Sequence, residues 1–99
     1  MANSDYQARV AKFIQMHDLE ASVEARLLDL TSEVGELAKE VLKASQYGRV
    51  PFAPNTAWAG ELGDAFLALI CLANNTQVNL DEALAAALKK YQARLAAKG

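Results

Sequence analysis

Apolar residues recur at helical spacing along nearly the whole chain, and this periodicity predicts an all-α protein. Four helices are expected, over residues 5–16, 22–47, 56–75 and 79–97. Ser4, Asn55 or Thr56, and Asn79 are suitable N-caps for the first, third and fourth helices. Gly48 is expected to follow the end of the second. We therefore expect a four-helix arrangement similar to a bundle.

The third predicted helix is apolar on nearly every side, which is typical of a helix buried by its neighbours. Its only charged side chains are Glu61 and Asp64. A buried carboxylate costs several kcal/mol unless a cation or a metal compensates it. No Lys or Arg occurs between Arg49 and Lys89. The compensation is therefore expected to come from another helix or from an ion.

Two acidic motifs share one spacing. They read Glu33-Val34-Gly35-Glu36 and Glu61-Leu62-Gly63-Asp64. Residues three apart on an α-helix lie on one face, with their Cβ atoms roughly 5–6 Å apart. A helical hairpin would let all four carboxylates converge into an oxygen-donor site for a hard cation, with Mg²⁺ as the expected ion. For the first motif alone, a solvated acidic face is the favoured explanation of the pattern.

Both motifs contain a mid-helix glycine, which costs about 1 kcal/mol relative to alanine. We interpret Gly35 and Gly63 as points where the two helices approach closely. The fourth helix carries Lys90 and Arg94 one turn apart. They either stabilise its C-terminal end or bind a phosphate together. Leu80, Leu84, Leu88 and Tyr91 of this helix are expected to face the other helices.

Composition narrows the classes of function. The 99 residues are expected to form one domain, residues 1–99, with a modest core that favours oligomerisation. A net charge of −2 argues against binding a nucleic-acid duplex. The longest apolar run, residues 65–73, is far short of the ~20 residues that span a membrane. No signal-peptide pattern precedes it, so we expect a cytoplasmic protein in which Cys71 is a small buried hydrophobe.

The acidic motifs and their surroundings resemble the MazG-like all-α nucleoside triphosphate pyrophosphohydrolases. The likeness rests on residues 30–37, on residues 61–66 and on Lys90-Tyr91-x-x-Arg94. It implies Mg²⁺-dependent cleavage of a nucleoside triphosphate between the α- and β-phosphates, in a homodimer or homotetramer with sites partly shared across subunits. The residue roles that it implies are Mg²⁺ binding by Glu33, Glu36, Glu61 and Asp64, catalysis by Glu33 and Glu36, and phosphate contacts by Lys90 and Arg94.

Two details leave room for other interpretations. Many members of this family carry a second glutamate where this chain has Ser32, and Asp29, one turn before Glu33, is a substitute for that charge. Trp58, one turn before Glu61, either stacks on a nucleotide base or belongs to the core. A non-catalytic helical oligomer or nucleotide-binding module with the same fold is the alternative function. A phosphoribosyl-ATP pyrophosphohydrolase is a closer alternative, which nothing in the sequence favours.

Overall fold

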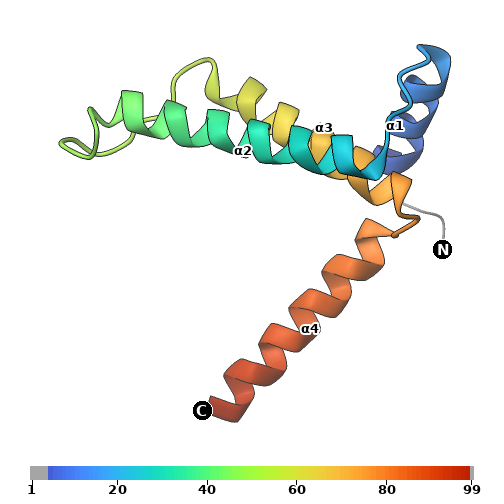
Figure 1. Ribbon diagram of the computed structural model, residues 1–99. Helices are drawn as coiled ribbons and strands as arrows, with labels where there is room; N and C mark the ends of the chain where they lie inside the picture. The colour runs from blue at the N-terminus through green and yellow to red at the C-terminus, as the bar shows by residue number, and fades with distance from the viewer. Residues whose placement is uncertain (1–4, 99) are drawn as a thin grey trace.

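The computed structural model describes residues 5–98, and these form four α-helices (Figure 1). The helices are α1 (Asp5–Met16), α2 (Val23–Ala44), α3 (Trp58–Asn75) and α4 (Leu80–Lys98). The predicted all-α fold with four helices is therefore confirmed. The predicted cap Ser4 lies outside the described residues. No helix in the described part of the chain is long and apolar enough to cross a membrane.

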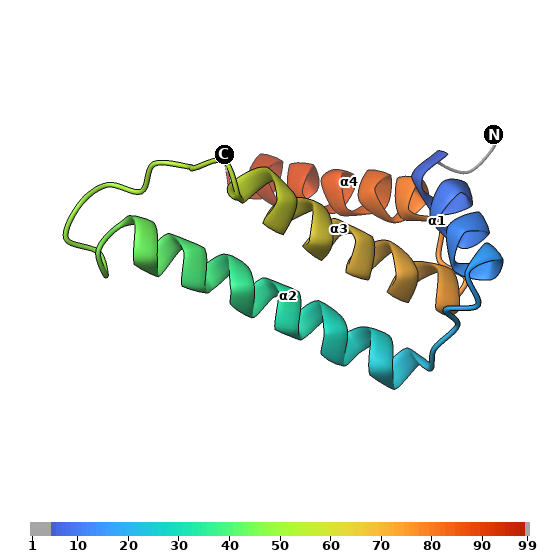
Figure 2. The same cartoon turned by 90° about the horizontal axis from the view of Figure 1, so that it is seen from above.

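The helices α2 and α3 form an antiparallel hairpin, and they lie side by side in both views (Figures 1 and 2). Ser22 starts α2 as its N-cap, because its Oγ accepts a hydrogen bond from the N–H of Ala25 at 3.1 Å. Helix α1 packs against α3. There the rings of Tyr6 and Phe66 meet edge to face, with centroids 5.2 Å apart. The α2–α3 hairpin is thus the frame on which the two acidic motifs are mounted.

Helix α2 ends earlier than the sequence predicted. It stops at Ala44, and the buried Ser45 caps it instead of the expected Gly48. Gln46 and Tyr47 follow with φ of +51° and +59°, a left-handed conformation that no helix can continue. The Ser45 Oγ then accepts a hydrogen bond from the N–H of Gly48 at 3.0 Å. Polar capping by serine therefore ends the helix one turn before the glycine.

The other helix ends agree more closely with expectation. Helix α3 begins at Trp58 rather than Thr56, and its N-cap is Ala57, without a side-chain cap, so the predicted caps Asn55 and Thr56 are wrong. The Asn55 Oδ1 instead accepts a hydrogen bond from the N–H of Ala57 at 2.9 Å, in the turn before the helix. Helix α4 begins as predicted after Asn79, whose Oδ1 accepts from the N–H of Glu82 at 3.0 Å. A side-chain cap therefore starts α4 but not α3.

The expectation that α3 is buried on every side is wrong for the single chain. The core of the described residues is small, and it consists of Ala68, Ile70, Cys71 and Ala73. The larger apolar side chains of α3 are 39–45% exposed, and these are Leu62, Phe66, Leu67 and Leu69. The reason is geometric, because α1 and α2 cover only part of the circumference of α3. Cys71 is buried, as predicted.

Helix α4 does not complete a bundle within one chain. It leaves the end of α3 and points away from the hairpin (Figure 1), and it packs closely on none of the other helices. The predicted inward-facing residues Leu84, Leu88 and Tyr91 are 59%, 61% and 55% exposed. That part of the prediction is wrong for the isolated chain, because the periodicity of α4 shows an apolar face but not what covers it.

A buried glutamine joins α1 to the connection between α3 and α4. Gln7 is 5% exposed, and its Nε2 donates to the Asn74 Oδ1 at 3.0 Å and to the Val78 carbonyl at 2.7 Å. Its Oε1 accepts from the N–H of Leu80 at 2.8 Å, and the Asn74 Nδ2 donates back to the Gln7 carbonyl at 3.0 Å. Every polar atom of the Gln7 amide group is therefore used at this junction.

Candidate metal centre

Three carboxylates converge between α2 and α3. Glu33 comes from α2, Glu61 and Asp64 come from α3, and one oxygen from each lies within 4.8 Å of the others. Glu33 and Glu61 are partly buried, and Asp64 is exposed. The three-residue spacing in α3 places its two acids on one face, toward the partner helix. Two acidic motifs far apart in sequence thus meet at one place, as predicted.

The electrostatics of the cluster centre on Glu33. Partial burial raises the pKa of its carboxyl above the ordinary 4.5, and the negative charges of Asp64, Asp29, Glu61 and Glu36 raise that pKa further. Glu36 itself is exposed and does not belong to the converging set of three. The structure therefore brings three of the four predicted metal ligands together and places Glu36 one turn away on α2.

The donor set suits a hard divalent cation. All three groups are carboxylates, which are the oxygen ligands that Mg²⁺ and Ca²⁺ prefer, whereas zinc sites use His and Cys. Like charges at this separation repel, and a bound cation would offset that repulsion. Among residues 5–98, no other three His, Cys, Asp or Glu side chains come this close to one another. The cluster is the metal site that the described residues offer.

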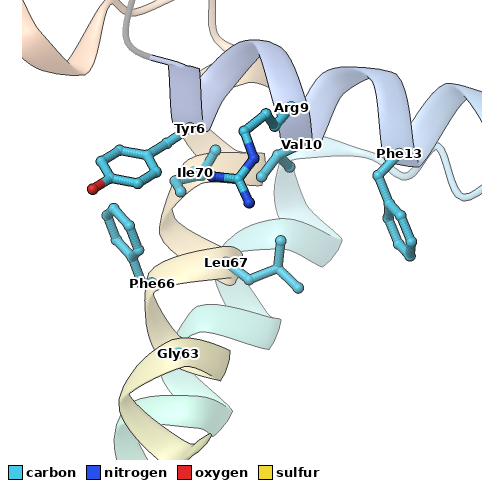
Figure 3. Close-up of a pocket in the computed structure, with 8 residues that line it drawn as sticks. All are labelled: Tyr6, Arg9, Val10, Phe13, Gly63, Phe66, Leu67 and Ile70. Atoms are coloured by element: carbon cyan, nitrogen blue, oxygen red, sulfur yellow. The ribbon is translucent and has the colours of Figure 1, made fainter. Parts of the chain in front are cut away.

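Two expectations from the sequence, the burial of Asp64 and the close helix approach at Gly35 and Gly63, are wrong. Asp64 is exposed, so burial alone does not demand a compensating ion there. Gly35 and Gly63 do not mark a close approach between helices, because a Cβ atom at either position would meet nothing within 4 Å. Gly63 instead borders a hollow of about 520 Å³ between α1 and α3 (Figure 3). Tyr6 and Phe66 face each other in that hollow.

A smaller hollow of about 300 Å³ adjoins the acidic cluster itself. Glu33 and Asp64 stand on its wall together with Asp29 and Arg26. Arg26 is not among the site residues predicted from the sequence. A signal was present, because Arg26 precedes Glu33 by seven residues, two helical turns, and so shares its face of α2. Cys71 also lines this hollow, and burial raises the pKa of its thiol.

The predicted substrate-binding residues lie elsewhere. Trp58 is partly buried at the start of α3, and its ring meets that of Phe52 with centroids 5.0 Å apart. Lys90 and Arg94 flank the ring of Tyr91 on α4, at 5.4 Å and 5.1 Å from its centroid. Because α4 points away from the hairpin (Figure 1), one chain does not bring these cations to the acidic cluster. Their roles stay predictions.

The chain is thus an all-α protein in which a helical hairpin joins acidic side chains from both its helices into one candidate metal site. Within this class, the chain belongs to the MazG nucleotide pyrophosphohydrolase domain family, whose model matches residues 21–96. The predicted family is therefore confirmed.

Individual relatives agree with this assignment. The protein YpjD of Bacillus subtilis is 35% identical over 94 residues, which cover 91% of this chain and 83% of YpjD. A crystal structure of YpjD is similar with a TM-score of 0.74 at 34% identity, and the match covers 92% of this chain and 93% of that one. The crystal structure of a MazG protein conserved in Bacillus, a nucleotide pyrophosphohydrolase, also gives 0.74, at 31% identity and 92% coverage of both chains.

Proposed function

We propose that the chain is a Mg²⁺-dependent enzyme that cleaves nucleoside or deoxynucleoside triphosphates into a monophosphate and pyrophosphate. In the cell this reaction would remove surplus or non-standard nucleotides. The observation that carries the proposal is the convergence of Glu33, Glu61 and Asp64 within 4.8 Å on the α2–α3 hairpin. Membership in the MazG family supports the class of reaction, and the similar Bacillus MazG protein is a nucleotide pyrophosphohydrolase.

The residues have separate tasks in this proposal. Glu33, Glu61 and Asp64 hold the ion, and Glu36 joins them from the next turn of α2. When bound, Mg²⁺ neutralises the cluster and polarises phosphate oxygens, which lets a triphosphate approach. Glu33 or Glu36 orients a water molecule and accepts its proton.

The proposed reaction is the hydrolysis of one phosphoanhydride bond. Water adds across the α–β phosphoanhydride bond, so one new P–O bond forms while the bridging P–O bond breaks. The pyrophosphate leaves with the electron pair of the bridge, and the proton of the water passes to the glutamate. Because the protein makes no covalent bond to the substrate, its contribution is positioning and electrostatic stabilisation.

A second copy of the chain completes the site in this proposal. One chain leaves the apolar face of α4 uncovered, with Leu88 and Tyr91 more than half exposed. Lys90 lies next to this face, and Arg94 follows one turn later. When α4 packs on another subunit, these two cations would contact the phosphates held at that subunit's acidic cluster. We therefore propose a homodimer or homotetramer as the active form.

The test is pyrophosphate release from a panel of ribo- and deoxyribonucleoside triphosphates, with Mg²⁺ and with a chelator. Metal-dependent release from one or more of them is expected. Silence across the whole panel from a folded, oligomeric protein would refute the proposal. The remaining interpretations would then be an enzyme for diphosphate or phosphoribosyl substrates, and after that a binding module that keeps the fold without the reaction.

A further inference from the structure

The hollow beside the acidic cluster is lined by carboxylates and by apolar side chains. Its volume is about 300 Å³, at the lower end of the range for small-molecule sites. Helix α1 and the segment after it close one side with Phe13, Ile14 and Leu19. A triphosphate bound at the cluster would therefore have room beside it for the rest of the nucleotide, on the side of α1.

Arg26 supplies the positive charge on this wall. Its Nη2 donates to the Leu19 carbonyl at 2.6 Å, and its buried Nε–H has no hydrogen-bond partner among residues 5–98. Within the same residues, no ion pair joins Arg26 to a carboxylate. An arginine only donates hydrogen bonds, and a buried N–H without a partner is costly. Because Arg26 lines the hollow, an oxygen acceptor bound there would give its guanidinium a hydrogen-bond partner.

Asp29 stands next to Arg26 on the same wall. The two residues are three apart on α2, so their Cβ atoms are roughly 5–6 Å apart. An ionised aspartate only accepts hydrogen bonds. The wall thus offers a donor and an acceptor side by side, which complements a C=O group adjacent to an N–H group. Hypoxanthine, guanine, uracil and thymine carry this pair, whereas adenine and cytosine carry an amino group beside an unprotonated ring nitrogen.

We propose that Arg26 and Asp29 select nucleotides with a 6-oxopurine or 4-oxopyrimidine base, with Arg26 donating to the base carbonyl and Asp29 accepting from the adjacent N–H. This assignment rests on the proposed function. It places the base toward Cys71 on α3, whereas stacking on Trp58 would place it beyond the opposite end of the acidic motif. The two positions exclude each other, so one experiment can separate them.

The experiment compares two pairs of substrates that differ at one exocyclic group, ITP with ATP and UTP with CTP. The wild-type protein is expected to favour the oxo member of each pair in kcat/KM by about 10- to 100-fold, the range of one hydrogen bond to a charged group. Equal or inverted values within the pairs would overturn the assignment while leaving the proposed function intact. Release from none of the four would instead contradict the proposed function.

The variant Arg26→Met tests the residue itself. It keeps the length of the side chain and removes its donors, so the ratio within each pair is expected to fall toward one. The ratio of kcat/KM for two substrates is independent of the fraction of folded protein. A loss of stability from the missing hydrogen bond to the Leu19 carbonyl therefore leaves the ratio unchanged. Arg9 lines the other hollow, between α1 and α3, so Arg9→Met is the matched control and is expected to keep the wild-type ratio. An unchanged ratio in Arg26→Met, or a ratio lost in Trp58→Leu alone, would overturn the proposal.

Discussion

Glu33 and Asp64 come from different helices, yet both line one hollow and both contribute to the same group of carboxylate oxygens within 4.8 Å. The charge of Asp64 is the largest electrostatic influence on the pKa of Glu33 after burial. In the metal-free protein, the two carboxylates repel each other across the contact between α2 and α3. A cation bound between them would instead hold the two helices together.

The carboxylates should be essential for turnover but not for folding. We expect Asp64→Ala and Glu36→Ala to lower Mg²⁺-dependent pyrophosphate release by about 100-fold or more, the scale on which loss of one charge-stabilising group acts. Far-ultraviolet circular dichroism should show an unchanged helical content. Asp81→Asn, which alters an exposed acid on α4, is the control. An active Asp64→Ala protein would contradict the metal-site assignment.

Thermal unfolding gives a test that does not depend on catalysis. If Mg²⁺ binds at the acidic cluster, as proposed, it should raise the Tm by mass action, because at 100 times its Kd it adds about 2.7 kcal/mol to the free energy of unfolding. The Asp64→Asn variant should lose this response, because one ligand charge is gone. Sodium chloride at equal ionic strength is the control for screening. A shift of the same size in Asp64→Asn would place the ion elsewhere.

The pH dependence of stability follows from the raised pKa of Glu33 in the folded state. The folded protein binds this proton more tightly than the unfolded chain does. The associated stability is therefore complete below the ordinary value of 4.5 and is lost as the pH rises through the folded pKa. In the metal-free protein, Glu33→Gln should match the wild-type Tm near pH 4 and exceed it near pH 7. A difference in Tm that is constant with pH would contradict the assigned electrostatics.

The exposed face of α4 predicts self-association. Leu88→Asp should shift the molar mass measured by light scattering toward the monomer, because it places an unpaired charge in the proposed subunit contact. Ala86→Asp introduces the same side chain on the other side of α4 and should keep the wild-type mass. A monomeric wild-type protein, or the same mass for all three proteins, would disprove the subunit contact.

Shared sites predict complementation between inactive variants. Asp64→Asn lacks part of the acidic cluster, and Arg94→Met lacks a proposed phosphate contact on α4. If each site combines the cluster of one chain with α4 of another, unfolding and refolding the two variants together should restore turnover. Refolding each alone should not. No recovery from mixed oligomers of verified composition would place both residues in the same chain's site.

The sequence was sufficient for the parts of the structure that depend on local periodicity. It identified four helices, and the matched spacing of the acidic motifs correctly placed Glu33, Glu61 and Asp64 together. The sequence predictions failed where they depended on which element packs against a given helix face. The apolar face of Leu88 had no partner within the chain, and Gly63 faces open space instead of a helix. The helical repeat shows which face of a helix is apolar. Which helix or subunit covers that face depends on the tertiary or quaternary structure.

Arg26 illustrates a different limit. Its place on the face of Glu33 follows from the helical repeat, but its chemistry follows from the Leu19 carbonyl, which the turn after α1 presents to it. The position of that carbonyl is set by tertiary packing, which the spacing of residues along α2 does not encode. The helical repeat is sufficient to predict that Arg26 lies near the cluster. Only the structure shows that its Nε–H has no hydrogen-bond partner among the described residues.

The amide of Gln7 has a mechanical consequence. It bonds to both ends of the short link between α3 and α4, and so it sets the direction in which α4 departs. A helix of 19 residues is roughly 28 Å long, so a rotation of about 10° at its N-terminus moves its C-terminus by roughly 5 Å. If copies of the chain associate through α4, as proposed, the hydrogen bonds of this one buried amide would set the angle at which they meet, and with it whether they close as a pair or as a larger ring.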